Sequence, residues 1–151
     1  MSEQWKPRVT VAAVIERENK FLIVEEEIDG KIVLNQPAGH WEDGETLIEA
    51  VIRETREETG WLFSPEAIIG IYHWRHPRSG DTYLRFAFCG EISDYNANQP
   101  LDDGIVAANW YTKEELQKRG AQHRSPQLML CIEEYQRGIR VPLDIITTVT
   151  S

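Results

Sequence analysis

The sequence is poor in cysteine and has no long apolar run, and each absence excludes a class of protein. The two cysteines, Cys89 and Cys131, lie far apart in apolar contexts, so we expect free buried thiols and no disulfide. No segment approaches the roughly 18 apolar residues of a membrane span. The N-terminal stretch MSEQWKPRVT lacks the basic and apolar regions of a secretory signal. We therefore expect a cytoplasmic protein with no membrane partner.

Positive charge is also scarce. The chain has 16 basic and 25 acidic residues, which gives a net charge of −9. This balance disfavours a general nucleic-acid-binding surface and repels a free polyphosphate at long range. A phosphorylated small molecule would therefore have to arrive as a metal complex or meet locally placed Arg and Lys side chains.

Repeats, low-complexity segments and linkers are likewise missing, which indicates a single domain over residues 1–151. Its length of 151 residues suffices for a sizeable core, and we expect a monomer or a homodimer. Hydrophobic periodicity and turn residues predict strands and helices in a definite order. The strands are expected at 8–16, 20–26, 31–35, 66–76, 82–92 and 105–111, and the helices at 46–59, 112–120 and 126–137.

Strands, one helix, further strands and two helices in that order predict a mixed α/β or α+β domain whose helices cover a sheet. Within 82–92 the alternation indicates that Leu84, Phe86 and Phe88 point inward and that Arg85 lies on the opposite face. Ser125 followed by Pro126 is typical of a helix start.

Three carboxylates in the first predicted helix carry the most chemical information. Glu54, Glu57 and Glu58 are spaced i, i+3, i+4, so they fall within roughly 100° of the helix circumference. Like charges that converge are unfavourable unless a cation lies between them. Oxygen ligands in this number suit a hard cation such as Mg²⁺ or Mn²⁺.

A run of Glu and Arg is more often a solvent-exposed charged face, but the position of the apolar residues argues against that here. On a helical wheel, Leu47, Ala50 and Val51 form an apolar stripe that continues into Glu54 and Glu58. The carboxylates thus end the inner face of the helix, which indicates a metal site at the edge of a core.

The segment GHWEDGETLIEAVIRETREETGW, residues 39–61, also resembles the Nudix box. Every fixed position of that pattern is matched; these positions are Gly39, Glu45, Arg53, Glu54, Glu57, Glu58 and Gly60. Two apolar positions differ and hold Thr55 and Trp61. Neither is a charged or metal-binding position, so these differences concern local packing.

The resemblance implies an α/β/α sandwich around a mixed β-sheet, and a hydrolase of diphosphates that depends on Mg²⁺, with Mn²⁺ as a substitute. It implies that the metal is held by Glu54, Glu57, Glu58 and the carbonyl of Ala38. Glu54 is the first candidate for the general base. Glu45 and Arg53 match the pair that braces the loop against the helix in this family.

Many family members carry a further acid six residues before a Trp. Counting back from Trp110 gives Gly104, so this chain departs from that pattern. Asp102 and Asp103 can take the place of that acid, although two acids before a glycine more often form a turn. The identity of the general base stays open.

Beyond the box, the runs LNQPAGHWE, HW with LRFAF, and HRSP with YQRG resemble a group of bacterial phosphatases within the family. This resemblance implies release of phosphate from nucleoside di- and triphosphates and from hydroxymethylpyrimidine pyrophosphate. Hydrolysis of nucleoside diphosphate sugars or dinucleoside polyphosphates is the alternative. A non-catalytic nucleotide sensor is disfavoured because all the box acids are present.

Substrate contacts are expected outside the box helix. His40, Trp74 and Arg85 are the main candidates. Trp41, Tyr72 and Tyr83 are further candidates for stacking on a ring, and Arg75 and Arg78 for contacting phosphate. For each aromatic residue, ordinary packing is the alternative.

Overall fold

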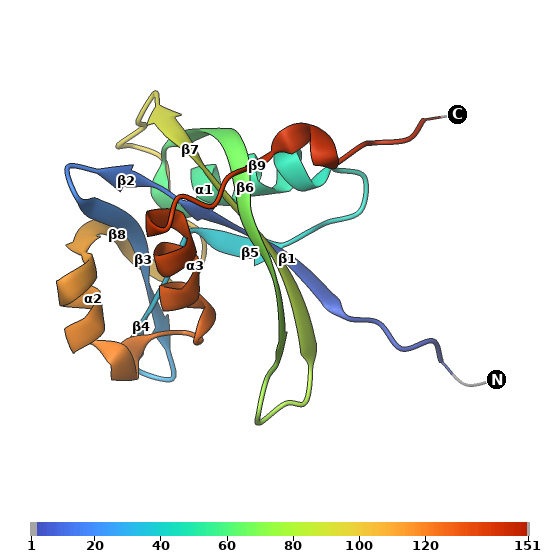
Figure 1. The fold of residues 1–151 in the computed structure, drawn as a ribbon. Coiled ribbons are helices and arrows are strands. Elements are labelled where there is room, and N and C mark those ends of the chain that lie inside the picture. Colours follow the sequence, from blue (N-terminus) through green and yellow to red (C-terminus); the bar gives the residue numbers. More distant parts are fainter. Residues whose placement is uncertain (1–2, 151) are drawn as a thin grey trace.

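The strands form two sheets in the computed structural model, which describes residues 3–150 (Figure 1). The strands are β1 (Arg8–Val14), β2 (Glu16–Arg17), β3 (Lys20–Ile28), β4 (Lys31–Asn35), β5 (Ala38–His40), β6 (Leu62–Arg75), β7 (Thr82–Ser93), β8 (Ile105–Thr112) and β9 (Val141–Pro142). The helices are α1 (Leu47–Thr59), α2 (Lys113–Lys118) and α3 (Gln127–Gln136), and short 3-10 turns occur at Gly120–Gln122 and Leu143–Ile145.

The larger sheet is mixed, as expected. Its strand order is β5-β1-β7-β6-β9; β1 runs parallel to β7, and the other neighbours are antiparallel. In the second sheet β3 pairs with β2, β4 and β8, always antiparallel. Among residues 3–150 no helix is long and apolar enough to cross a membrane.

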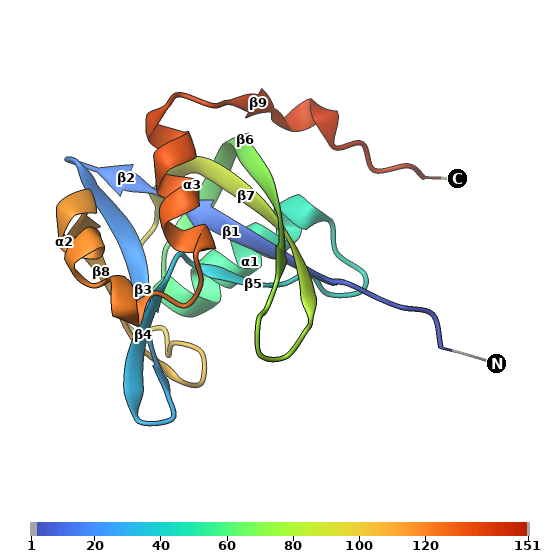
Figure 2. The same cartoon turned by 60° about the horizontal axis from the view of Figure 1, so that its bottom comes forward.

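Two hydrophobic cores lie on opposite faces of the strands. The helix α1 contributes Val51 to one core, and α3 contributes Leu128 to the other. Alternate residues of β3 divide between them, with Phe21 and Ile23 on the α3 side and Leu22 on the α1 side. Figures 1 and 2 show α1 and α3 on either side of the strands, which makes the architecture an α/β/α sandwich.

The box helix begins and ends where its sequence indicates. The Thr46 side chain accepts a hydrogen bond from the Glu49 backbone N–H, and the Glu49 side chain accepts one from the Thr46 N–H. This reciprocal pair is a capping box, which is typical of a Thr followed three residues later by a Glu at a helix start. At the other end Gly60 has φ of 80°, a left-handed conformation that glycine adopts without strain.

The inward prediction for β7 holds for Phe88, which is fully buried, and for the half-buried Phe86, which packs against the same core on the α1 side. Leu84 is half-buried and belongs to neither core, whereas Arg85, on the opposite face, is 4 % exposed. The cause is that β7 lies between β1 and β6 in the larger sheet and has helices on both faces. A strand covered on both faces does not show the simple alternation of a half-exposed one.

Several elements differ from their predicted bounds, and β6 and α3 show why. β6 begins at Leu62 and includes Pro65, where a register shift interrupts its pairing with β7. A strand tolerates proline at such an irregularity because a ladder hydrogen bond is already missing there. The helix α3 begins at Gln127, and the Ser125 hydroxyl accepts a hydrogen bond from the Gln127 N–H at 3.2 Å. Cys89 and Cys131 are free and buried, as predicted.

Candidate active site

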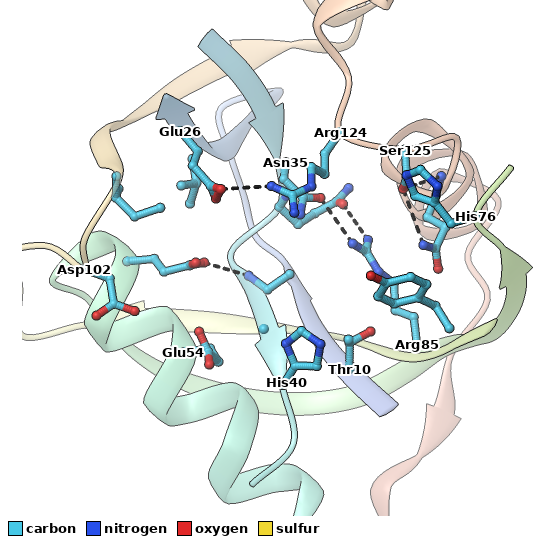
Figure 3. A pocket seen from close by; sticks show the side chains of 18 of the residues that line it. Thr10, Glu26, Asn35, His40, Glu54, His76, Arg85, Asp102, Arg124 and Ser125 are labelled. Atoms are coloured by element: carbon cyan, nitrogen blue, oxygen red, sulfur yellow. Dashed lines mark hydrogen bonds and ion pairs between the residues drawn. The ribbon is translucent and has the colours of Figure 1, made fainter. Parts of the chain in front are cut away.

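A cavity of about 510 Å³ is lined by residues from both sheets, from α1 and from the start of α3. Figure 3 shows that Glu54 and Asp102 lie on one side of it and Arg85 and Ser125 on the other. The cavity therefore has an acidic end and an end that carries arginine and neutral polar side chains.

Three carboxylates converge at the acidic end. One ligand oxygen from each of Glu54, Glu57 and Asp102 lies within 4.8 Å of the other two. Glu54 is buried, Glu57 is half-buried and Asp102 is exposed, so the cluster opens to solvent on one side. The donor set consists only of carboxylate oxygens and fits a hard divalent cation.

Asp102 reaches the cluster because its loop is fastened to the C-terminal half of α1. The Asp102 backbone N–H donates to the Glu57 carbonyl at 3.0 Å, and the Asn96 N–H donates to the Gly60 carbonyl at 2.9 Å. The Gln99 side-chain amide donates to the Arg56 carbonyl at 2.7 Å. These bonds reach carbonyls in and just after the last turn of the helix, where partners within the helix run out; among them, the Arg56 carbonyl also accepts from the Gly60 N–H.

Glu58 is also buried but has a separate contact. Its Oε1 accepts a hydrogen bond from the Ala38 N–H at 2.8 Å. Burial raises the pKa of Glu58 to about 9, and this outweighs the hydrogen bond, which acts in the opposite direction. Burial also raises the pKa of Glu54 to about 7, against the lowering effect of Arg53. Both carboxyl groups are thus unfavourable as anions unless a cation is close.

Arg53 connects the carboxylates to the loop before the helix. Its Nε and Nη2 donate to the two carboxylate oxygens of Glu45 at 3.0 and 2.8 Å. Its Nη1 donates to Glu54 and Glu57, and Nη2 also donates to the His40 carbonyl. All five N–H groups of the guanidinium are therefore used, which suits a bracing role.

The box glycine allows strand β5 to approach the helix. A Cβ atom at Gly39 would overlap the carboxyl group of Glu54. The two positions that differ from the box pattern are accommodated by local contacts. The Thr55 hydroxyl is buried and donates to the Val51 carbonyl at 2.8 Å, and the Trp61 ring packs against Tyr95 with centroids 4.7 Å apart.

The three expected substrate-binding residues, His40, Trp74 and Arg85, all line the cavity. His40 is exposed at the end of β5, but its ring is partly desolvated, and this desolvation together with the charges of Arg8 and Arg124 lowers its pKa. Of the secondary candidates, Tyr83 lines the cavity, whereas Trp41, Tyr72, Arg75 and Arg78 do not. The Trp41 indole instead donates to the Glu45 carbonyl at 2.7 Å.

Comparison with known proteins agrees with this geometry. The family model of the NUDIX domain matches residues 6–131. The chain belongs to the Nudix family. Among solved structures, a Nudix hydrolase from Nitrosomonas europaea is 51% identical and superposes with a TM-score of 0.93, covering 95% of this chain and 98% of its own. This match confirms the predicted Nudix fold.

Curated proteins with similar sequences indicate which kind of Nudix hydrolase this chain resembles. Phosphatase NudJ of Shigella boydii and phosphatase NudJ of Escherichia coli K12 are each 44% identical over 142 residues, which covers 94% of this chain and 92% of each relative. This Nudix chain is a hydrolase similar to these phosphatases. Nudix hydrolases in general use divalent metals, and the acidic cluster can bind one.

Asp102 is the site residue that sequence reasoning placed least firmly. It lies two positions from the place where the family pattern expects an acid, and its Asp-Asp-Gly context is typical of a turn. Its place beside Glu57 results from the contacts of the loop with α1. Gln36 and Gln127 were not predicted, because each lies near another polar residue, Asn35 or Ser125, and the sequence carries no local signal that they are buried.

Proposed function

We propose that this Nudix hydrolase is a Mg²⁺-dependent phosphatase, with Mn²⁺ as a substitute, that removes terminal phosphate from nucleoside di- and triphosphates. Following the sequence resemblance, we include hydroxymethylpyrimidine pyrophosphate among its substrates. The observation that carries the proposal is the convergence of Glu54, Glu57 and Asp102, of which Glu54 and Asp102 line a cavity large enough for a nucleotide. The similarity to phosphatase NudJ supports release of phosphate.

We assign the cation to Glu54, Glu57 and Asp102, with Glu58 and the Ala38 carbonyl as further ligands. When bound, Mg²⁺ supplies charge neutralisation at the phosphates and activates a water for attack. Arg53 holds Oε1 of Glu54 at 2.8 Å, so the carboxylate is oriented before substrate arrives. We assign proton abstraction to Glu54 because it is the cluster member that lies buried in the cavity.

The acidic end also explains how a protein of net charge −9 accepts a polyphosphate. Without a cation, the carboxylates and the phosphates repel one another. With a cation the same carboxylates hold the substrate, so binding and metal dependence are coupled. Glu26, which lines this end, is already paired with Arg124 at 2.8 Å and adds little repulsion.

The function is tested with a panel of purified substrates in Mg²⁺ or Mn²⁺. The panel contains nucleoside di- and triphosphates, hydroxymethylpyrimidine pyrophosphate, nucleoside diphosphate sugars and dinucleoside polyphosphates. We expect inorganic phosphate as the product from the first two groups, and no activity in EDTA. A Glu54→Gln variant purified in the same way controls for contaminating phosphatases. Pyrophosphate or a sugar phosphate as the main product would reject the phosphatase assignment.

Three other expectations belong to this proposal. We propose one domain over residues 1–151, a cytoplasmic location, and a monomer or homodimer that does not bind nucleic acid. Sedimentation of the purified protein measures the oligomeric state.

A further inference from the structure

Aromatic and basic side chains share one face of the larger sheet at the end of the cavity away from Glu54. In the pairing of β6 with β7, Tyr72 lies opposite Arg85 and Trp74 lies opposite Tyr83. Directly opposed residues of antiparallel strands point to the same side. Trp74, Tyr83 and Arg85 all line the cavity, and the two aromatic rings are 5.9 Å apart.

Arg85 is a buried guanidinium without a carboxylate partner. It is 4 % exposed, and none of the ion pairs found in residues 3–150 includes it. Its Nη1 donates to Oε1 of Gln36 at 2.9 Å and contacts the Cys131 sulfur at 3.7 Å, and its Nη2 donates to Oδ1 of Asn35 at 3.2 Å. Two of its five N–H groups remain, one of them on Nε, which is buried without a partner.

A neutral acceptor lines the same cavity. Gln127, the first residue of α3, is 5 % exposed and lines the cavity, and its Oε1 is buried without a hydrogen-bond partner. Gln127 and Cys131 are four residues apart and therefore lie on the same face of α3. Because Arg85 contacts Cys131, the free donors of Arg85 and the free acceptor of Gln127 belong to one corner of the cavity.

Unpaired buried polar groups are unfavourable, and more so when they are charged. Gln36 reinforces the arrangement, since its Nε2 donates to the Leu128 carbonyl at 2.8 Å while its Oε1 holds Arg85. Hydrogen bonds thus hold Arg85 in place, and yet its Nε and the Oε1 of Gln127 still lack hydrogen-bond partners. A ligand that supplies an acceptor to Arg85 and a donor to Gln127 would complete both.

We propose that Arg85 and Gln127 form a recognition subsite for the edge of a heteroaromatic ring, with Trp74 and Tyr83 as its stacking surface. The ring carries an acceptor next to a donor, as the lactam edge of uracil or guanine and the amidine edge of cytosine or adenine do. The subsite deepens the proposed function, because the ring is the non-phosphate part of the same substrate. It lies opposite the carboxylates across the cavity (Figure 3).

A ring fits these groups better than a second phosphate does. A phosphate satisfies the donors of Arg85 but brings negative charge to the free oxygen of Gln127. It also makes no use of the neighbouring aromatic surface, whereas any base stacks on such a surface. A heterocycle with one acceptor and one donor uses the free donors of Arg85, the free acceptor of Gln127 and the aromatic surface.

The test compares ligands that differ only in the ring. The affinities of the four common nucleoside monophosphates and of ribose 5-phosphate, which have no phosphoanhydride bond to hydrolyse, are measured by calorimetry in Mg²⁺. We expect at least one monophosphate to bind wild-type protein about tenfold or more tightly than ribose 5-phosphate. Arg85→Lys, which cannot reproduce the planar fork of donors, and Gln127→Leu should each reduce that preference by about tenfold, which corresponds to one good hydrogen bond.

Arg75→Lys is the matched control. Arg75 is exposed on β6 and does not line the cavity, so this variant should keep the preference of the wild type. Gln127→Leu keeps the proposal testable if Arg85→Lys unfolds, because it leaves the buried charge and its partners in place.

Three results would overturn the subsite. The first is that the wild type binds nucleoside monophosphates and ribose 5-phosphate equally well, and the second is that folded Arg85→Lys and Gln127→Leu variants keep the preference of the wild type. The third is that these variants lose as much affinity for ribose 5-phosphate as for the nucleotides, which would make the corner a phosphate site. Because binding is measured without hydrolysis, a protein inactive on every substrate of the panel still gives an answer here. Conversely, wild-type protein that hydrolyses the substrates of the panel but shows no preference for ligands with a ring would reject the subsite alone.

Discussion

At the scale of single residues, the buried carboxyl group of Glu58 lowers the stability of the folded protein once it ionises. Burial raises its pKa in the folded protein to about 9, from an ordinary value of 4.5. The folded state therefore holds the proton more tightly than the unfolded state does. The stabilisation is fully present below about pH 4.5 and is lost as the pH rises through the window up to about 9.

We therefore predict that the metal-free protein melts at a lower temperature at pH 8 than at pH 6. Glu58→Gln, which cannot ionise, should flatten this dependence and raise the melting temperature at pH 8 by several degrees, on the order expected for a domain of this size. Melting curves in EDTA at both pH values measure it. A Glu58→Gln variant that melts at a lower temperature than wild type at pH 8 would show that Glu58 is stabilising as an anion.

Trp74 gives a second prediction at this scale. It lines the cavity and is half-buried, so Trp74→Ala should raise KM for nucleotides. Turnover at saturation should stay within a few-fold, because stacking is about equal in the ground state and the transition state. Steady-state kinetics and a melting curve on the same sample check this. A loss of roughly 3–5 kcal/mol of stability would instead assign Trp74 to the core.

At the scale of elements, Arg53 fastens the loop between β5 and α1 to the helix. It donates to both oxygens of Glu45 and to the His40 carbonyl. Arg53→Ala should lower the melting temperature, because it leaves a partly buried carboxylate without its partner, and should lower activity by less than Glu54→Gln does. If melting is unchanged and turnover disappears, Arg53 contacts phosphate and the brace is wrongly assigned.

The loop before β8 gives a matched pair of variants at the same scale. Asp102 and Asp103 are adjacent, but only Asp102 belongs to the carboxylate cluster. Asp102→Asn should weaken Mn²⁺ binding by about tenfold or more, whereas Asp103→Asn should change it little. Titration of Mn²⁺ followed by electron paramagnetic resonance distinguishes them. Equal effects would mean that general negative charge at the loop matters, and not the position of one carboxylate.

At the scale of the whole molecule, the predictable features were those with local signals. The box helix and its caps follow from residues within one segment, such as Thr46, Glu49 and Gly60, whose hydrogen bonds span a few positions. The family pattern then indicated which carboxylates of α1 to consider as metal ligands. These features can be predicted without knowing which distant segments contact one another in the fold.

What the sequence did not reveal depends on contacts between distant segments. Arg85 is buried because a strand in the middle of the sheet is covered on both faces. Register shifts within β6, one of them between Ile68 and Gly70, determine which residues oppose Arg85. Asp102 reaches Glu57 only because a loop packs against the end of α1. Periodicity within one segment carries none of this information.

In the function that we propose, hydrolysis depends on carboxylates that converge on a divalent cation. The most direct test of this dependence is the turnover of Glu57→Gln with saturating Mg²⁺ and nucleotide. Glu133→Gln is the control, because Glu133 is an exposed residue of α3 and does not line the cavity. We predict a loss on the order of 100-fold or more for Glu57→Gln, an unchanged melting temperature in EDTA, and normal turnover for Glu133→Gln. Turnover of Glu57→Gln close to that of wild type would contradict the account.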